Sequence, residues 1–138
     1  MASSDLEIMR GVYDAFARRD LDTIRAAIHP DFVMEQSTAL PWGGVRHGPD
    51  GFFAFLGALL SHVDPTVAIE DLFDAGDHVV QVGHTSGTVL DTGAPFRARE
   101  VHVWQLRDGL ITSYRVLIDV PAMLAALQSA GQGQLDGG

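Results

Sequence analysis

The chain has 138 residues, of which 46% are hydrophobic and 20% charged, the composition of one ordinary globular domain. Its formal net charge of −9 argues against a nucleic-acid partner, because phosphate recognition needs clustered Lys and Arg. Cysteine and lysine are absent, which excludes disulfides, thiolate metal sites and a Schiff-base lysine. No segment has the pattern of a signal peptide or of a membrane span, so we expect a soluble cytoplasmic protein without a membrane partner.

The first half of the chain predicts three helices. Ser4 and Glu7 form a capping box ahead of apolar residues at helical spacing. Asp20 is the expected N-cap of a short second helix, which ends before Pro30. The remaining expected elements are a strand at 31–36, a loop rich in Pro and Gly at 37–49, and a third helix from 50 to about 62.

The second half changes to the two-residue alternation of strands. Strands are expected at 66–73, 78–89, 96–107 and 110–120. A short helix should follow from Pro121 to about Ser129, with a flexible tail from Gly131. We therefore expect a single domain over residues 1–138 with an ordered core at about 5–129. Its fold class is α+β, with helices packed on one face of a curved antiparallel sheet.

The last two strands form the most informative hairpin. Asp108-Gly109 is a strong signal for a two-residue turn. Regular alternation away from this turn predicts one face that mixes charged and apolar side chains, which is typical of a pocket wall. That face would carry Glu100, His102, Trp104, Arg115, Leu117 and Asp119.

Six stretches of the sequence resemble one known superfamily. They are Tyr13–Phe16, Asp20–Asp22, His29–Glu35, Gly48–Phe55, His102–Gly109 and Tyr114–Asp119. Together they are similar to the ketosteroid isomerase and nuclear transport factor 2 superfamily, and within it to the SnoaL-like polyketide cyclases. The resemblance implies a cone-shaped half-barrel that encloses a deep apolar cavity, in a homodimer formed through the sheet. It leaves the reaction open, because one fold hosts many functions.

The resemblance also implies roles for single residues. Glu35 falls where the isomerase has its carboxylate base, and His102 falls near its second oxyanion donor. The isomerase's phenolic donor would fall at Val12, one residue from Tyr13. Asp119 resembles the acid/base aspartate of the SnoaL-like cyclases.

Each catalytic candidate has an alternative structural role. His102 is either an acid/base or oxyanion donor, or a satisfied half-buried histidine. Asp119 is either catalytic or the N-cap of the helix at Pro121. Glu35 is either a base inside the cavity or a solvated carboxylate at the end of a strand.

The binding candidates also have more than one possible role. Glu100 and Arg115 are expected to form an ion pair that orients His102, and Arg115 could instead hold an anionic group of the substrate. His84 could approach Glu100, but no ligand spacing predicts a metal. Trp42 is a candidate lid or surface anchor. The other residues expected to shape the cavity are Tyr13, Phe16, Trp104 and Leu117.

We therefore expect a SnoaL-like enzyme without a cofactor, which uses acid/base chemistry to isomerise, cyclise or dehydrate a hydrophobic carbonyl compound. The alternative is a module of the same fold that binds a hydrophobic ligand, or forms a dimer, without catalysis.

Overall fold

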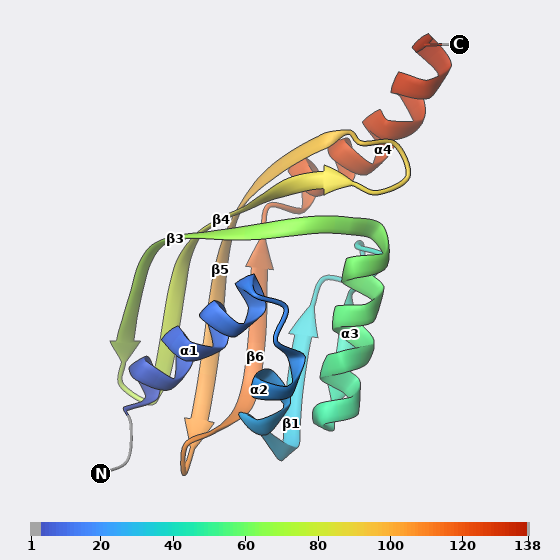
Figure 1. Cartoon of the computed structure of the whole chain (residues 1–138). Coiled ribbons are helices and arrows are strands. Elements are labelled where there is room, and N and C mark those ends of the chain that lie inside the picture. The colour runs from blue at the N-terminus through green and yellow to red at the C-terminus, as the bar shows by residue number, and fades with distance from the viewer. Residues whose placement is uncertain (1–3, 138) are drawn as a thin grey trace.

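The computed structural model describes residues 4–137, and the side chains up to residue 129. The helices are α1 (Asp5–Ala17), α2 (Leu21–Ala26), α3 (Gly48–His62) and α4 (Val120–Gly137). The strands are β1 (Ile28–Gln36), β2 (Gly44–His47), β3 (Val63–Ala75), β4 (His78–Val89), β5 (Pro95–Arg107) and β6 (Leu110–Ile118). The strands form one sheet in the order β2-β1-β6-β5-β4-β3. Figure 1 shows α1, α2 and α3 on the same side of this sheet, with long strands curving around them.

The predicted fold class is confirmed. All neighbouring strands are antiparallel except β1 and β6, which run parallel. The sheet is curved but not closed, because β2 and β3 remain its two edges. In the described part of the chain, no helix is long and apolar enough to cross a membrane.

The predicted helix caps are present. The Ser4 hydroxyl accepts a hydrogen bond from the backbone N–H of Glu7 at 3.1 Å. The Asp20 carboxylate accepts one from the N–H of Thr23 at 3.2 Å. Each cap satisfies an N–H that has no partner within its own helix. Local sequence therefore sets where α1 and α2 begin.

Two elements differ most from the predictions, and β1 and β3 also begin three residues earlier than expected, at Ile28 and Val63. Strand β2 lies inside the segment expected to be a loop, at the edge of the sheet, where four residues pair with β1. Helix α4 continues to Gly137 and so passes the predicted end near Ser129. Gly138, the last residue of the predicted tail, lies outside the described residues.

The β5–β6 hairpin has the predicted turn but not the predicted register. Asp108 and Gly109 have φ values of 53° and 78°, and Arg107 lies opposite Leu110 as expected. Beyond this turn the register shifts by one residue, since Leu106 lies opposite Ile111 but Gln105 lies opposite Ser113. Thr112 is the extra residue of this β-bulge, and its hydroxyl donates to the Gln105 carbonyl at 3.1 Å.

The bulge decides which side chains of β6 face the helices. A one-residue shift moves every later side chain to the other face of a sheet. We call the face towards the helices the inner face, and it carries Glu100, His102, Trp104 and Tyr114. The opposite side is the outer face, and it carries Arg115 and Leu117, both exposed.

The hydrophobic core lies between the inner face and the helices. Met9 of α1, Phe32 of β1 and Ile111 of β6 are fully buried there. Phe52 of α3 packs edge-to-face on Phe32, with ring centroids 5.6 Å apart. The core is continuous around a space that remains unfilled, and this space is the candidate site.

Candidate functional site

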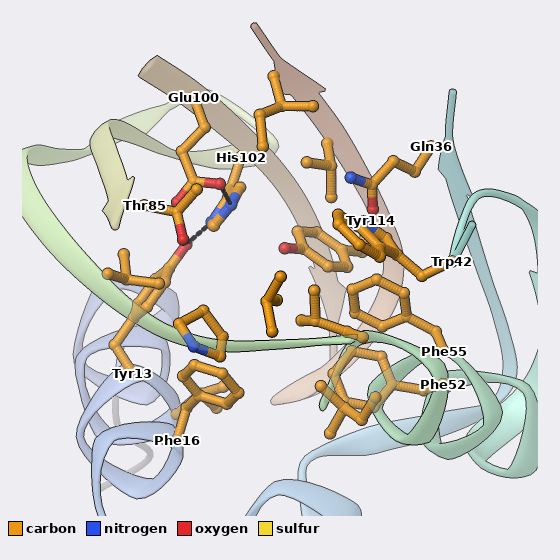
Figure 2. Close-up of a pocket in the computed structure, with 18 of the residues that line it drawn as sticks. Tyr13, Phe16, Gln36, Trp42, Phe52, Phe55, Thr85, Glu100, His102 and Tyr114 are labelled. Atoms are coloured by element: carbon orange, nitrogen blue, oxygen red, sulfur yellow. Dashed lines mark hydrogen bonds and ion pairs between the residues drawn. The ribbon is translucent and has the colours of Figure 1, made fainter. Parts of the chain in front are cut away.

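A cavity lies between the inner face and the helices, and its lining is predominantly apolar. Its volume is about 80 Å³. Because one water molecule needs roughly 10–15 Å³, the cavity has room for several waters or for a compact ligand. Its polar side chains are few and come from α1, β1, β4, β5 and β6: Tyr13, Gln36, Thr85, Glu100, His102 and Tyr114. Figure 2 shows these groups arranged around the open space, with Phe16, Phe52 and Phe55 below them.

Four of the site's side chains form one buried hydrogen-bond chain. The indole N–H of Trp104 donates to the Tyr13 hydroxyl oxygen at 2.8 Å. That oxygen lies 2.6 Å from Nδ1 of His102. On the other side of the imidazole, Nε2 lies 2.9 Å from Oε2 of Glu100, and both side chains of this pair are only 5% exposed. The dashed lines in Figure 2 trace the part of this chain from Tyr13 to Glu100.

The chemistry of the partners determines which atom donates each hydrogen bond. A carboxylate only accepts hydrogen bonds, so Nε2 of His102 carries the proton that it shares with Glu100. In the neutral imidazole Nδ1 is then an acceptor, and the Tyr13 hydroxyl donates to it. Protonation of His102 would reverse the second bond and free the Tyr13 proton for a ligand. Tyr13 is therefore the member of the chain whose donor can be redirected into the cavity.

Tyr114 brings a second phenol to the same space. Its ring stacks on Trp104, which lies opposite it in the ladder, with centroids 3.7 Å apart and planes within 6°. In Figure 2 its hydroxyl points into the open space, on the side of Tyr13 and His102. No hydrogen bond ties this hydroxyl within the described residues.

Burial keeps both phenols protonated. It raises the pKa of Tyr13 far above its usual value of 10, although the bond from Trp104 acts in the opposite direction. Burial also raises the pKa of Tyr114, and the nearby Tyr13 and Glu100 raise it further. A phenol that stays neutral cannot serve as a base at ordinary pH, but it can donate a hydrogen bond to a developing oxyanion. The two tyrosines are thus donors.

Several buried polar atoms near the cavity have no hydrogen-bond partner. They include Oε1 of Glu100 and Oε1 of Gln36, and both residues line the cavity. Buried polar groups are normally paired, and unpaired ones need a water, a ligand or a function to account for them. Glu100 thus combines one anchored oxygen with one unpaired oxygen in an apolar cavity.

Six of the residues predicted for the site line this cavity. They are Tyr13, Phe16, Trp42, Glu100, His102 and Trp104. Trp42 is only 2% exposed and belongs to the core, so it is a wall of the cavity and not a surface anchor. The other predicted residues do not line it.

The prediction that Arg115, Leu117 and Asp119 share a face with His102 is wrong. It assumed an unbroken alternation, and the bulge at Thr112 places these residues in the opposite phase. Leu117 is 53% exposed on the outer face. The expected pair of Arg115 with Glu100 is also absent, because Arg115 pairs with Glu35 at 2.9 Å.

The other two carboxylate candidates have structural partners outside the cavity. Glu35 lies on the outer face, where its side chain and that of Arg115 are 53% and 62% exposed. Asp119 accepts a hydrogen bond from the N–H of Ala122 at 3.1 Å, which is the N-cap arrangement that the sequence left open. His84 pairs with Glu70 at 2.6 Å and does not line the cavity.

Sequence reasoning missed Tyr114 and Gln36. Tyr114, Val116 and Ile118 alternate as an apolar set, whereas the intervening set contains two charged residues, Arg115 and Asp119, beside Leu117. This difference in hydrophobicity favours Tyr114 on the inner face. The sequence offers no signal for Gln36, because it lies at the end of a strand and its neighbours in the sequence are polar. No group of three His, Asp or Glu side chains suited to a metal ion occurs among the residues that the structure describes.

Comparison with solved structures extends these observations. The fold is similar to an NTF2-like protein of unknown function from Burkholderia pseudomallei (27% identity, TM-score 0.84, 91% of this chain and 98% of that chain). It is also similar to TerC, which was co-crystallised with polyporic acid (26% identity, TM-score 0.83, 91% and 99%). A third similar structure is IdmH, a candidate polyketide cyclase from Streptomyces antibioticus (27% identity, TM-score 0.72, 91% and 99%).

A search of curated proteins found no match. The SnoaL-like domain family matches residues 9–114, which is more than half of the chain and includes most of α1, all of β1 and most of the β5–β6 hairpin. The chain therefore belongs to the SnoaL-like domain family, within the NTF2-like fold.

Proposed function

We propose that this protein catalyses a proton transfer on a hydrophobic small molecule that contains a carbonyl group, without a cofactor. The net reaction would be an isomerisation, a cyclisation or a dehydration, each of which can pass through an enolate. The main observation in support is that the Glu100 carboxylate and two neutral phenols line the same apolar cavity. The similarity to a candidate polyketide cyclase supports this class of substrate.

The roles follow from the contacts. Glu100 would take the proton next to the carbonyl through its unpaired Oε1, while His102 holds Oε2 in place. Tyr114 would donate a hydrogen bond to the enolate oxygen. Tyr13 would do the same when a protonated His102 donates from Nδ1 to the Tyr13 oxygen, because the one phenolic proton cannot serve His102 and the enolate together. His102 is then a positioning residue, because Glu100 and Tyr13 occupy its two ring nitrogens.

Deuterium exchange tests this proposal without knowledge of the natural substrate. The ketone 1-tetralone is incubated with the protein in D₂O, and incorporation of deuterium next to its carbonyl is followed by NMR. Glu100→Gln should slow the exchange by about 10²–10⁴-fold, the usual contribution of a general base. Tyr13→Phe should slow it by about 10²-fold, as the loss of one oxyanion donor does.

Glu35→Gln is the matched control, since it removes a carboxylate from the outer face and should leave the rate within about twofold. Exchange no faster than in buffer would reject the catalytic proposal. Equal rates in wild type and a folded Glu100→Gln variant would reject Glu100 as the base.

A second candidate function is a dimer-forming module that binds a ligand without catalysis. The observation in its favour is the exposed apolar set on the outer side of β1, β2 and β6, formed by Val33, Val45 and Leu117. Dimerisation through this face is compatible with catalysis in the cavity behind it. Sedimentation of wild type and Leu117→Asp would test the dimer, because a charge within this exposed apolar set should dissociate it.

A further inference from the structure

Gln36 is a polar group of the cavity that the proposed proton transfer does not use. It is the last residue of β1, its exposure is 6%, and its Oε1 has no hydrogen-bond partner. Figure 2 shows its amide on one side of Tyr114, with Tyr13 and Glu100 on the other side. The cavity therefore has polar groups at two separated positions.

The surroundings of Gln36 make its isolation costly. Trp42, Phe55 and Val116 line the cavity with it, and no hydrogen bond from any of these side chains reaches the Gln36 oxygen. A buried amide oxygen without a partner loses its hydration and gains nothing in return. A bound molecule with a donor at this position would remove that cost.

The other unpaired buried amide does not share this position. Gln81 is completely buried, and neither its oxygen nor its nitrogen has a partner. However, Gln81 does not line the cavity, and it lies opposite His102 in the β4–β5 ladder. Gln36 thus carries the unpaired amide oxygen that a ligand in the cavity can reach.

We infer that Gln36 determines specificity, because its Oε1 accepts a hydrogen bond from a hydroxyl at the end of the ligand remote from the reacting carbonyl. The inference rests on the proposed function, since both use the same cavity. It narrows the substrate class to flat apolar compounds with a carbonyl at one end and a hydroxyl at the other. The stacked Trp104 and Tyr114 rings form a wall along the apolar middle of such a compound.

Three ketones of one shape test this inference by calorimetric titration. They are 1-tetralone, 6-hydroxy-1-tetralone, and 6-methoxy-1-tetralone, which can accept a hydrogen bond at the remote end but cannot donate one. Wild type should bind the hydroxy compound about 10-fold more tightly than 1-tetralone, the value of one net buried hydrogen bond. The methoxy compound should gain nothing over 1-tetralone.

The Gln36→Leu variant should lose this preference, keeping at most about a twofold difference, while its affinity for 1-tetralone stays equal or improves. Gln105→Leu is the matched control, because Gln105 is a half-buried glutamine that does not line the cavity, and its preference should match wild type. If Gln36→Leu does not fold by circular dichroism, Gln36→Met carries the same expectation.

The inference would be overturned by equal binding of the hydroxy and unsubstituted ketones by wild type, by a preference that survives in Gln36→Leu, or by no binding of either ketone at millimolar concentration. A gain for the methoxy compound equal to that of the hydroxy compound would also overturn it. Deuterium exchange without a hydroxyl preference would leave the proposed function standing and reject this inference. A Gln36-dependent preference for the hydroxy compound without any deuterium exchange would support the role of Gln36 in binding and reject the proposed catalysis.

Discussion

The two faces of the β5–β6 hairpin carry similar residue types in opposite environments. The inner face holds Glu100 with a histidine, and both side chains are 5% exposed. The outer face holds Arg115 with Glu35, and both side chains are more than half exposed. Each pair has a contact distance of 2.9 Å, so distance alone does not separate them.

Burial separates the two pairs. An exposed ion pair is screened by water and contributes little, whereas a buried carboxylate depends on its partner because it has lost its hydration. Of these two pairs, the inner one lines the apolar cavity and lies beside the neutral phenols. A carboxylate paired with a basic side chain is therefore an exposed ion pair on one face of the sheet and a candidate reactive centre on the other.

The largest expected effect comes from changing which residues belong to each face. Val103 lies in the regular part of β5. Its deletion would move the side chains on one side of the deletion to the opposite face of the sheet. We expect the free energy of unfolding to fall by more than about 5 kcal/mol, since charged and core side chains would exchange places. Urea denaturation followed by circular dichroism measures this.

Deletion of Thr112 is the matched control. It removes the extra residue of the bulge and leaves Gln105 opposite Ser113. The expected cost is at most about 2 kcal/mol, because a hydrogen bond of the bulge is lost but no face is exchanged. If this deletion were as damaging as that of Val103, the bulge would not be what sets the inner face.

This bulge also marks the limit of what the sequence could predict. Features set by near neighbours in the chain were predictable, such as the Ser4 and Asp20 caps and the turn at Asp108-Gly109. Each of them depends on residues at most three positions apart. The bulge depends on the pairing of two strands, and the sequence of either strand alone does not require it.

The candidate site was predictable only in part for the same reason. Alternation along β5 correctly grouped Glu100, His102 and Trp104. The bond from Tyr13 to His102 joins residues 89 positions apart, and it needs the packing of α1 on the sheet. Glu35 seemed a base through family resemblance, yet single-residue alternation along β1 places it on the outer face, next to Gln36 on the inner one.

A smaller effect should separate the two ion pairs directly. His102→Leu leaves the buried Glu100 carboxylate without its partner, and it should cost about 3–5 kcal/mol of unfolding free energy. Arg115→Leu breaks the exposed pair and should cost less than about 1 kcal/mol. Urea denaturation of each variant measures both values.

The double variants complete the comparison. Leucine at both Glu100 and His102 should recover much of the loss, because no unpaired buried charge remains. Leucine at both Glu35 and Arg115 should show a coupling close to zero. Similar costs for His102→Leu and Arg115→Leu would mean that burial does not distinguish the two faces.

The smallest expected effect concerns alkaline pH and again involves only the inner side. Tyr13 and Tyr114 are the only tyrosines of the chain, and burial raises the pKa of both. In the unfolded chain they ionise near pH 10, whereas in the folded protein they stay neutral at that pH. Their contribution to stability is therefore complete below pH 10 and is lost as the pH rises above it.

Each phenol should remove about 1.4 kcal/mol of unfolding free energy per pH unit above pH 10, or about 2.7 kcal/mol for the two together. Urea denaturation over this pH range measures the slope, and Tyr114→Phe should halve it because phenylalanine cannot ionise. Tyrosinate absorbance should rise only with unfolding. Absorbance that rises near pH 10 while the protein remains folded would show that water reaches the phenols, and the inner face would then differ less from the outer one than the structure indicates.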